Sequence, residues 1–202
     1  MKDNGFLFFK NYEVPKIALL GKYLNIDENT GKFSVKGNLK VMYASMMRVR
    51  RHILFHATFG MVYSVLIAIR YANVRTQFEV EGKERLVITY QLQKSKIYPQ
   101  IAKSYACFFA SKHISGIMDD SQQKIMNKND FSLMKEVHIL LCCGKALYST
   151  WCNEVTIKML QACGGHGFLA SSGFYAIMEK LWSGAIYEGD NTVLLLQVAR
   201  EL

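Results

Sequence analysis

Apolar and small residues recur at three- and four-residue steps through most of the chain after residue 40. This is the period of an α-helix that buries one face. The longest run predicts one helix over residues 41–79, and its stripe consists of Met42, Met46, Val49, Ile53, Ala57, Gly60, Ser64, Ile67 and Tyr71.

The same period predicts four further helices. We place them at about 87–118, at 131–163, at 173–182, and from near Asn191 to the end of the chain. The run from Gly164 to Gly167 ends the third of them, because glycine commonly follows a helix C-terminus. The polar residues 119–130 are predicted to form a surface connection.

Residues 1–40 have a different pattern. Short apolar pieces are separated by Pro15 and Gly21, and the polar stretch from Asp27 to Lys32 predicts a turn between two of them. We expect a strand, a crossing segment and a loop. The predicted fold is therefore mainly α, an antiparallel helix bundle over 41–202 with a short extended or β N-terminal arm over 1–40.

The centre of the first helix raises the question of a membrane span. Residues Ile53 to Ile69 are mostly apolar and have arginines on both sides. Their number is at the short limit for crossing a bilayer, and polar residues such as His56 and Thr58 interrupt the run. A buried bundle helix is the favoured interpretation, so no transmembrane span is expected.

Composition narrows the choice of ligand only partly. The net charge of +9 suits a phosphorylated ligand such as a CoA ester or a flavin dinucleotide, and it equally suits nucleic acid or an anionic membrane. No nucleic-acid-binding motif accompanies the charge, so nucleic acid is not expected as a partner. Five cysteines in apolar helical stretches, without a CxxC pair, indicate buried thiols in a reducing compartment and no metal site.

Two short segments carry the candidate chemistry. One, from Gln161 to Gly167, lies at a helix end, and the other, from Ile186 to Thr192, lies just before a helix start. Either segment alone is typical of a cap or a turn. The first segment has a glycine pair, which allows a ligand or backbone to approach closely. The second has a carboxylate, Glu188, beside Tyr187. A carboxylate in an apolar setting is poorly solvated, which favours its use as a base.

These segments resemble those of the acyl-CoA dehydrogenases and oxidases. The resemblance rests on Gly164-Gly165 followed 24 residues later by the glutamate of Tyr187-Glu188-Gly189. Gly-Gly-His-Gly and Glu-Gly-Asp-Asn-Thr are more similar to the peroxisomal oxidases than to the dehydrogenases. The segments 68–78, 3–6 and 11–15 also resemble the oxidases, in the same order along the chain. By this resemblance, residues 1–40 are the end of a β-domain and its connecting arm, and 41–202 is the helical domain that faces FAD and acyl-CoA.

The resemblance implies a role for individual residues. Glu188 corresponds to the base that removes the α-proton of the acyl-CoA thioester, and Gly189 and Arg50 correspond to substrate-binding positions. The expected FAD-binding residues form two sets. Asp190 and Thr192 contact the flavin of their own subunit, whereas the flavin of a neighbouring subunit is held by Arg75, Phe78, Gln161, Gly164 and Gly165.

The family's activity then becomes an expectation for this chain. It is the FAD-dependent α,β-desaturation of acyl-CoA to trans-2-enoyl-CoA in fatty-acid β-oxidation, with O₂ reduced to H₂O₂ by the reduced flavin. The expected protein is a homodimer located in the peroxisome or, alternatively, the mitochondrion. The chain is shorter than the family's enzymes. A second hypothesis is therefore a non-catalytic structural subunit that uses the same bundle inside a larger assembly.

Overall fold

The computed structural model describes residues 5–19, 21, 24–35 and 40–202, with side chains in the first helix described from Ser45 onward. Contacts within the chain divide it after Met46 into two units. Each unit is described by itself below.

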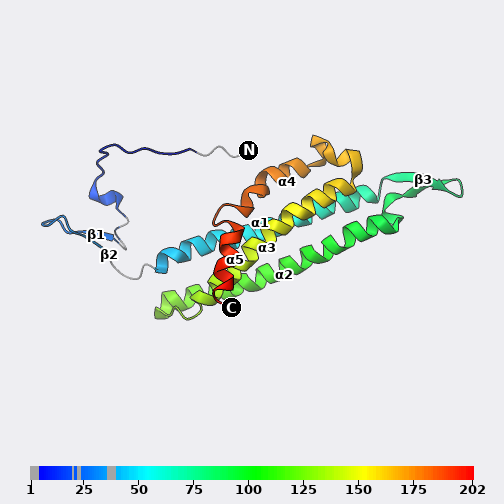
Figure 1. The fold of residues 1–202 in the computed structure, drawn as a ribbon. Coiled ribbons are helices and arrows are strands. Elements are labelled where there is room, and N and C mark those ends of the chain that lie inside the picture. The colour runs from blue at the N-terminus through cyan, green and yellow to red at the C-terminus, as the bar shows by residue number, and fades with distance from the viewer. Residues whose placement is uncertain (1–4, 20, 22–23, 36–39) are drawn as a thin grey trace. The chain divides into compact units, whose positions relative to one another are not determined.

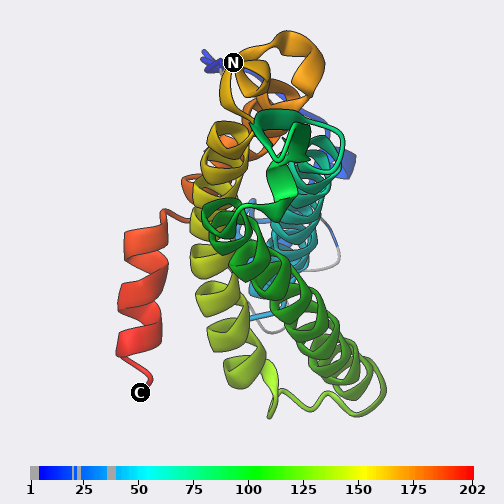
Figure 2. The same cartoon turned by 90° about the vertical axis from the view of Figure 1, so that its right-hand side faces the viewer.

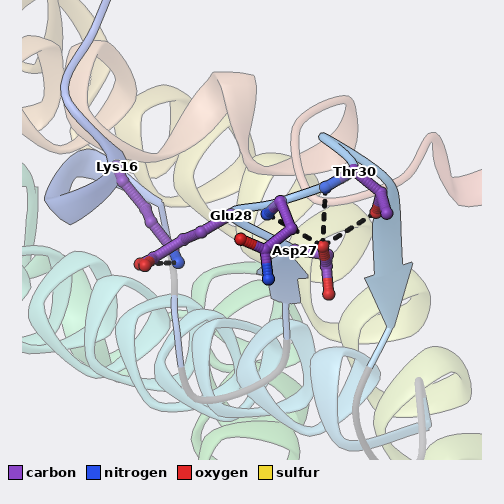
Figure 3. A network of polar contacts seen from close by, with 5 residues as sticks. Lys16, Asp27, Glu28 and Thr30 are labelled. Atoms are coloured by element: carbon purple, nitrogen blue, oxygen red, sulfur yellow. Dashed lines mark hydrogen bonds and ion pairs between the residues drawn. The ribbon is translucent and has the colours of Figure 1, made fainter.

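The N-terminal unit contains a small β-hairpin. A 3₁₀ turn, Lys16–Ala18, precedes strand β1 (Leu24–Ile26), which pairs antiparallel with β2 (Phe33–Val35). Figure 3 shows the connecting turn, in which one Asp27 oxygen accepts hydrogen bonds from the Asn29 and Thr30 amides at 3.0 and 2.8 Å. These bonds hold the pKa of Asp27 below its usual range. The turn predicted between Asp27 and Lys32 is thus confirmed.

The second unit is a helix bundle, which confirms the predicted mainly α fold. Its helices are α1 (Lys40–Ala72), which belongs to this unit from Met47 onward, α2 (Gln91–Lys128), α3 (Met134–Ala162), α4 (Phe174–Leu181) and α5 (Asn191–Ala199). Helices α1, α2 and α3 run alongside one another, and neighbours in the chain have opposite directions (Figure 1). The short helix α5 lies against the N-terminal half of α3 (Figure 2).

Helix α3 contributes the most extensively buried stripe of the bundle. Its buried apolar side chains recur at helical spacing and include Val137, Leu141, Cys142, Ala146, Cys152, Val155 and Met159. Buried hydroxyls join the helices as well, since Ser64 Oγ of α1 lies 3.0 Å from Thr156 Oγ1 of α3. Each hydroxyl oxygen also lies within hydrogen-bond distance of a carbonyl oxygen of its own helix. One hydroxyl can therefore donate across to the other while the second donates within its own helix, so burial leaves neither of them unsatisfied.

Two predicted boundaries are wrong. Helix α1 ends at Ala72, and part of the stretch assigned to its end forms a hairpin of β3 (Thr76–Val80) and β4 (Lys83–Leu86). The β-branched and aromatic residues of β3 favour this extended form. The predicted surface connection over 119–130 is mostly the last turns of α2. This stretch contains good helix formers and no glycine or proline. The helix ends at Asn129, which adopts the left-handed conformation.

One stretch of α1, Ser45–Ala72, is long and apolar enough to cross a membrane by length and composition alone. Half of its most apolar window is buried inside the bundle. Packing against α3 therefore accounts for much of its apolar character.

Candidate active site

The turn that carries Glu188 connects α4 to α5. A 3₁₀ segment, Trp182–Ala185, precedes it, and Asp190 caps α5 by accepting the Thr192 amide hydrogen at 2.9 Å. Glu188 has a φ of 60°, and Gly189 has a φ of 106°. Glycine adopts a positive φ readily, but a glutamate in the left-handed region is strained, and this conformation persists only where its surroundings fix it.

Arg50 holds this turn from α1. The side chain is 5 % exposed, and its Nε donates a hydrogen bond to the backbone oxygen of Glu188 at 3.1 Å. Its Nη1 donates to the Cys142 sulfur at 3.4 Å. Arg50 was predicted to bind the substrate. The structure places its side chain inside the bundle, in contact with the backbone of the candidate base. Its contact with CoA stays a prediction.

Lys145 of α3 holds the same turn and is a residue that sequence reasoning missed. It is fully buried, and its Nζ donates to the Gly189 oxygen at 2.6 Å and to Asn191 Oδ1 at 2.8 Å. Burial lowers the pKa of Lys145 to about 8, against the opposing effect of the Asp190 carboxylate. The sequence feature that could have identified it is its position as a single lysine within the apolar stretch from Ile139 to Ala146.

Asn191 extends the contact between the turn and α3. Its Nδ2 lies within hydrogen-bond reach of Ser149 Oγ at 2.9 Å, of Thr150 Oγ1 at 3.1 Å and of the Ala146 carbonyl oxygen at 3.1 Å. Because Asn191 is the first residue of α5, these bonds fix where that helix begins. The turn is thereby tied to α3 on its C-terminal side.

His138 of α3 also lies close to the Arg50 guanidinium. His138 Nδ1 is 3.5 Å from Arg50 Nη1, and its Nε2 is 3.1 Å from Gln197 Oε1 of α5. Burial lowers the pKa of His138, and the positive charge of Arg50 lowers it further. Both effects favour the neutral imidazole, which adds no second positive charge beside the guanidinium.

The remaining predicted FAD-binding residues gather at the other end of α3. Arg75 Nη1 lies 3.4 Å from the Tyr71 hydroxyl and 3.5 Å from His166 Nδ1, which brings the arginine beside the Gly164-Gly165 segment. A Cβ built on either glycine of that pair meets no atom within 4 Å, so both face open space. In contrast, a Cβ on Gly167 would lie 2.1 Å from the Leu160 oxygen, so this position requires glycine.

Gln161 and Phe78 complete this second group. Gln161 is exposed and lines an open pocket of about 310 Å³ together with Ser95, Lys96, Gln100 and Lys158. Phe78 is 72 % exposed on β3 and has a φ of 61° at an irregularity in the pairing of β3 with β4. An exposed aromatic ring and an exposed amide are suited to contact a ligand or another chain.

The structure thus does not bring all the predicted residues together. Lys145, beside Glu188, is separated from the end of α3 at Ala162 by roughly 25 Å, from the 1.5 Å rise per residue of an α-helix. The two groups are therefore two sites on one bundle. Among the described residues, no group of three or more histidine, cysteine or acidic side chains could hold a metal ion.

Comparison with known proteins identifies the family of the chain. Residues 43–202 match the family described as acyl-CoA oxidase, C-alpha1 domain. Peroxisomal acyl-coenzyme A oxidase 2 of Mus musculus is 34 % identical over 203 residues, covering 99 % of this chain and 30 % of the mouse protein. The chain therefore spans about a third of the length of such relatives.

Solved structures give the same result. Arabidopsis thaliana acyl-CoA oxidase 1 is 30 % identical and superposes with a TM-score of 0.88 over 95 % of this chain and 29 % of its own. Acyl-CoA oxidase-1 of Caenorhabditis elegans, complexed with FAD and ATP, is 29 % identical with a TM-score of 0.83, covering 96 % of this chain and 28 % of its own. The chain belongs to the acyl-CoA oxidase family.

Proposed function

We propose that this chain is the FAD- and acyl-CoA-facing helical part of an acyl-CoA oxidase, with Glu188 as its catalytic base. The observation that carries the proposal is the double anchoring of the Glu188–Gly189 turn. Arg50 of α1 binds the oxygen of Glu188, and Lys145 of α3 binds the oxygen of Gly189. A base must be held in a fixed position relative to its substrate, and two buried cations acting on two consecutive carbonyls provide such a hold.

In the proposed reaction, the Glu188 carboxylate removes the α-proton of the acyl-CoA thioester and becomes a carboxylic acid. Bound FAD would supply the oxidation, by taking up the β-hydrogen as hydride; reoxidation by O₂ would consume two electrons and two protons, one of them the proton given up by Glu188, and yield H₂O₂. The protein residues keep the carboxylate in position while the α,β double bond of the enoyl-CoA forms. General base catalysis of this kind contributes on the order of 10²–10⁴ in rate.

The second group of residues suits the diphosphate part of FAD. Arg75 offers a cation, Gln161 an exposed amide, and Gly164 and Gly165 allow backbone to approach the ligand because their Cβ positions face open space. Phe78 adds an exposed ring. The C. elegans oxidase in the comparison is complexed with FAD, which supports the same cofactor here.

The distance between the two groups supports a dimer. We infer that Asp190 and Thr192, beside Glu188, contact the flavin of their own subunit, and that Arg75 and Gln161 contact the flavin of a second subunit. The net charge of +9 suits both the flavin diphosphate and the CoA phosphates, with Arg50 and Gly189 on the CoA side. The mouse relative is named peroxisomal, and we propose the peroxisome for this protein also.

The proposal is tested by isolating the protein from its own source and measuring flavin absorbance, H₂O₂ production and enoyl-CoA formation after addition of acyl-CoA. Bound flavin that is bleached by acyl-CoA without oxygen, and H₂O₂ produced with oxygen, are the expected results. A colourless protein within a large assembly, inactive after addition of FAD, would instead support the non-catalytic structural subunit.

A further inference from the structure

A fully buried lysine beside a candidate base requires an explanation. Moving an ammonium group out of water costs several kcal/mol unless hydrogen bonds and opposite charges compensate for it. Lys145 has 0 % exposure, and a methionine or leucine at the same place in α3 would incur no such cost. The lysine therefore acts through the groups that it contacts.

Both acceptors of Lys145 belong to the segment that follows Glu188. The Gly189 oxygen at 2.6 Å is one peptide beyond the oxygen that Arg50 binds, and Asn191 Oδ1 at 2.8 Å is at the start of α5. The carboxylates of Asp190 and Glu188 are the negative charges that face the ammonium, whereas Arg50 opposes its charge. The contacts of Lys145 are thus concentrated on the turn rather than distributed through the bundle.

We propose that Lys145 is a positioning residue for Glu188, acting through the Gly189 carbonyl and Asn191 to fix the left-handed turn that carries the carboxylate. This inference rests on the proposed role of Glu188 as the base. Lys145 does not itself contact the reacting atoms. Its loss is expected to leave the fold and substrate binding largely in place while the carboxylate samples unproductive positions.

Turnover by the flavin-loaded protein is the first test. Lys145→Met keeps the length of the side chain and removes the ammonium, and we expect kcat to fall about 100-fold, the penalty typical of a small misplacement of a catalytic group. The KM for acyl-CoA is expected to change less than about threefold. Lys135→Met is the matched control, because Lys135 is on the same helix and its side chain is 69 % exposed. Full kcat in Lys145→Met would overturn the proposal.

Hydrogen exchange in the 202-residue chain is the second test and does not depend on turnover. We expect Lys145→Met to speed amide exchange at Glu188, Gly189 and Thr192, and to leave amides of α3 such as Val155 unchanged. Uniformly faster exchange throughout α3 would mean that Lys145 only stabilises the bundle, which would contradict the proposal. If the methionine variant does not fold, Lys145→Gln, whose side chain is uncharged and one atom shorter, replaces it in both measurements with the same expected and contradicting results.

The failure of this inference can be told apart from the failure of the proposed function. If Glu188→Gln retains full turnover, the assignment of the base is wrong and the positioning role fails with it. If Glu188→Gln is inactive while Lys145→Met is fully active, Glu188 remains the base and only the role of Lys145 is lost.

Discussion

Arg50 Nε donates a hydrogen bond to the backbone oxygen of Glu188 at 3.1 Å, across 138 positions of the sequence. The contact joins the first long helix to the turn before the last helix. The guanidinium is buried, and its second contact, with the Cys142 sulfur, ties it to α3 as well. One side chain thereby connects α1, α3 and the turn that carries the candidate base.

The stability of the bundle should depend on this contact. Arg50→Met is expected to lower the free energy of unfolding by about 2 kcal/mol, since it removes charge-assisted hydrogen bonds and leaves a buried carbonyl without its donor. Urea unfolding of the 202-residue chain measures this. Arg51→Met is the control, because Arg51 pairs with the exposed Asp119 and its loss should cost less than about 1 kcal/mol. Equal losses in the two variants would argue against the role given to Arg50.

Gly189→Ala should destabilise the chain, whereas Gly165→Ala, at the other end of α3, should not. An alanine Cβ at position 189 would lie 2.8 Å from Leu194 Cδ2, at a φ of 106° that side chains rarely adopt. We expect a loss of about 2 kcal/mol in the free energy of unfolding together with reduced turnover. Gly165→Ala, whose Cβ meets nothing within 4 Å, should unfold like the parent chain and change only flavin binding. The reverse order of stabilities would show that the turn tolerates the side chain.

Arg75→Ala should weaken flavin retention. Loss of one arginine–phosphate contact is worth roughly 1.4 kcal/mol, or a tenfold rise in the dissociation constant for FAD. Flavin content after dialysis and fluorescence titration with FAD measure the effect. Arg85→Ala is the control, because Arg85 is on the same hairpin and packs over the Tyr90 ring. Equal flavin retention in both variants and the parent would remove Arg75 from the FAD site.

The charge of Lys145 predicts a pH dependence of stability. Its pKa is about 8 in the folded chain and 10.5 ordinarily, so between these values the unfolded state binds more protons and the free energy of unfolding rises with pH. The titratable and charged groups that act on it are Asp190, Arg50, Glu188 and the Cys142 thiol. Relative to Lys145→Met, the parent should gain at most about 1.4 kcal/mol per pH unit in this window. A difference that stays constant from pH 7 to 10 would contradict the lowered pKa.

The helices could be predicted from the sequence because their apolar period is long and regular. The stripe of α3 identified that helix to within three residues at its start, and Gly164, with a φ of 59°, follows its end as expected. The hairpin after α1 was missed because only three residues, none of them glycine or proline, separate the end of α1 at Ala72 from the start of β3 at Thr76. The end of α2 was missed because residues 119–130 are mostly polar and have only a weak helical period of apolar residues, a pattern that is also typical of a loop.

The candidate site could be predicted only in part. Glu188 and the glycine pair were singled out because their order and spacing form a motif, and their roles stay predictions. Lys145 was missed because its significance comes from a contact with Gly189, 44 positions away, that no local pattern reveals. Arg50 was selected because of its position in the family pattern. Its contact with the Glu188 oxygen was not predicted, because that contact depends on how α1 packs against α3.

The central claim is that Glu188 removes the α-proton, and exchange of that proton tests it most directly. The flavin-loaded protein and its Glu188→Gln variant would be incubated with acyl-CoA deuterated at the α-carbon, and the release of deuterium into water and the kcat for oxidation would be measured. We predict that the variant retains its flavin and loses at least about 100-fold in both rates, as expected for removal of a general base. Release of deuterium at the parent rate by the variant would show that another group is the base.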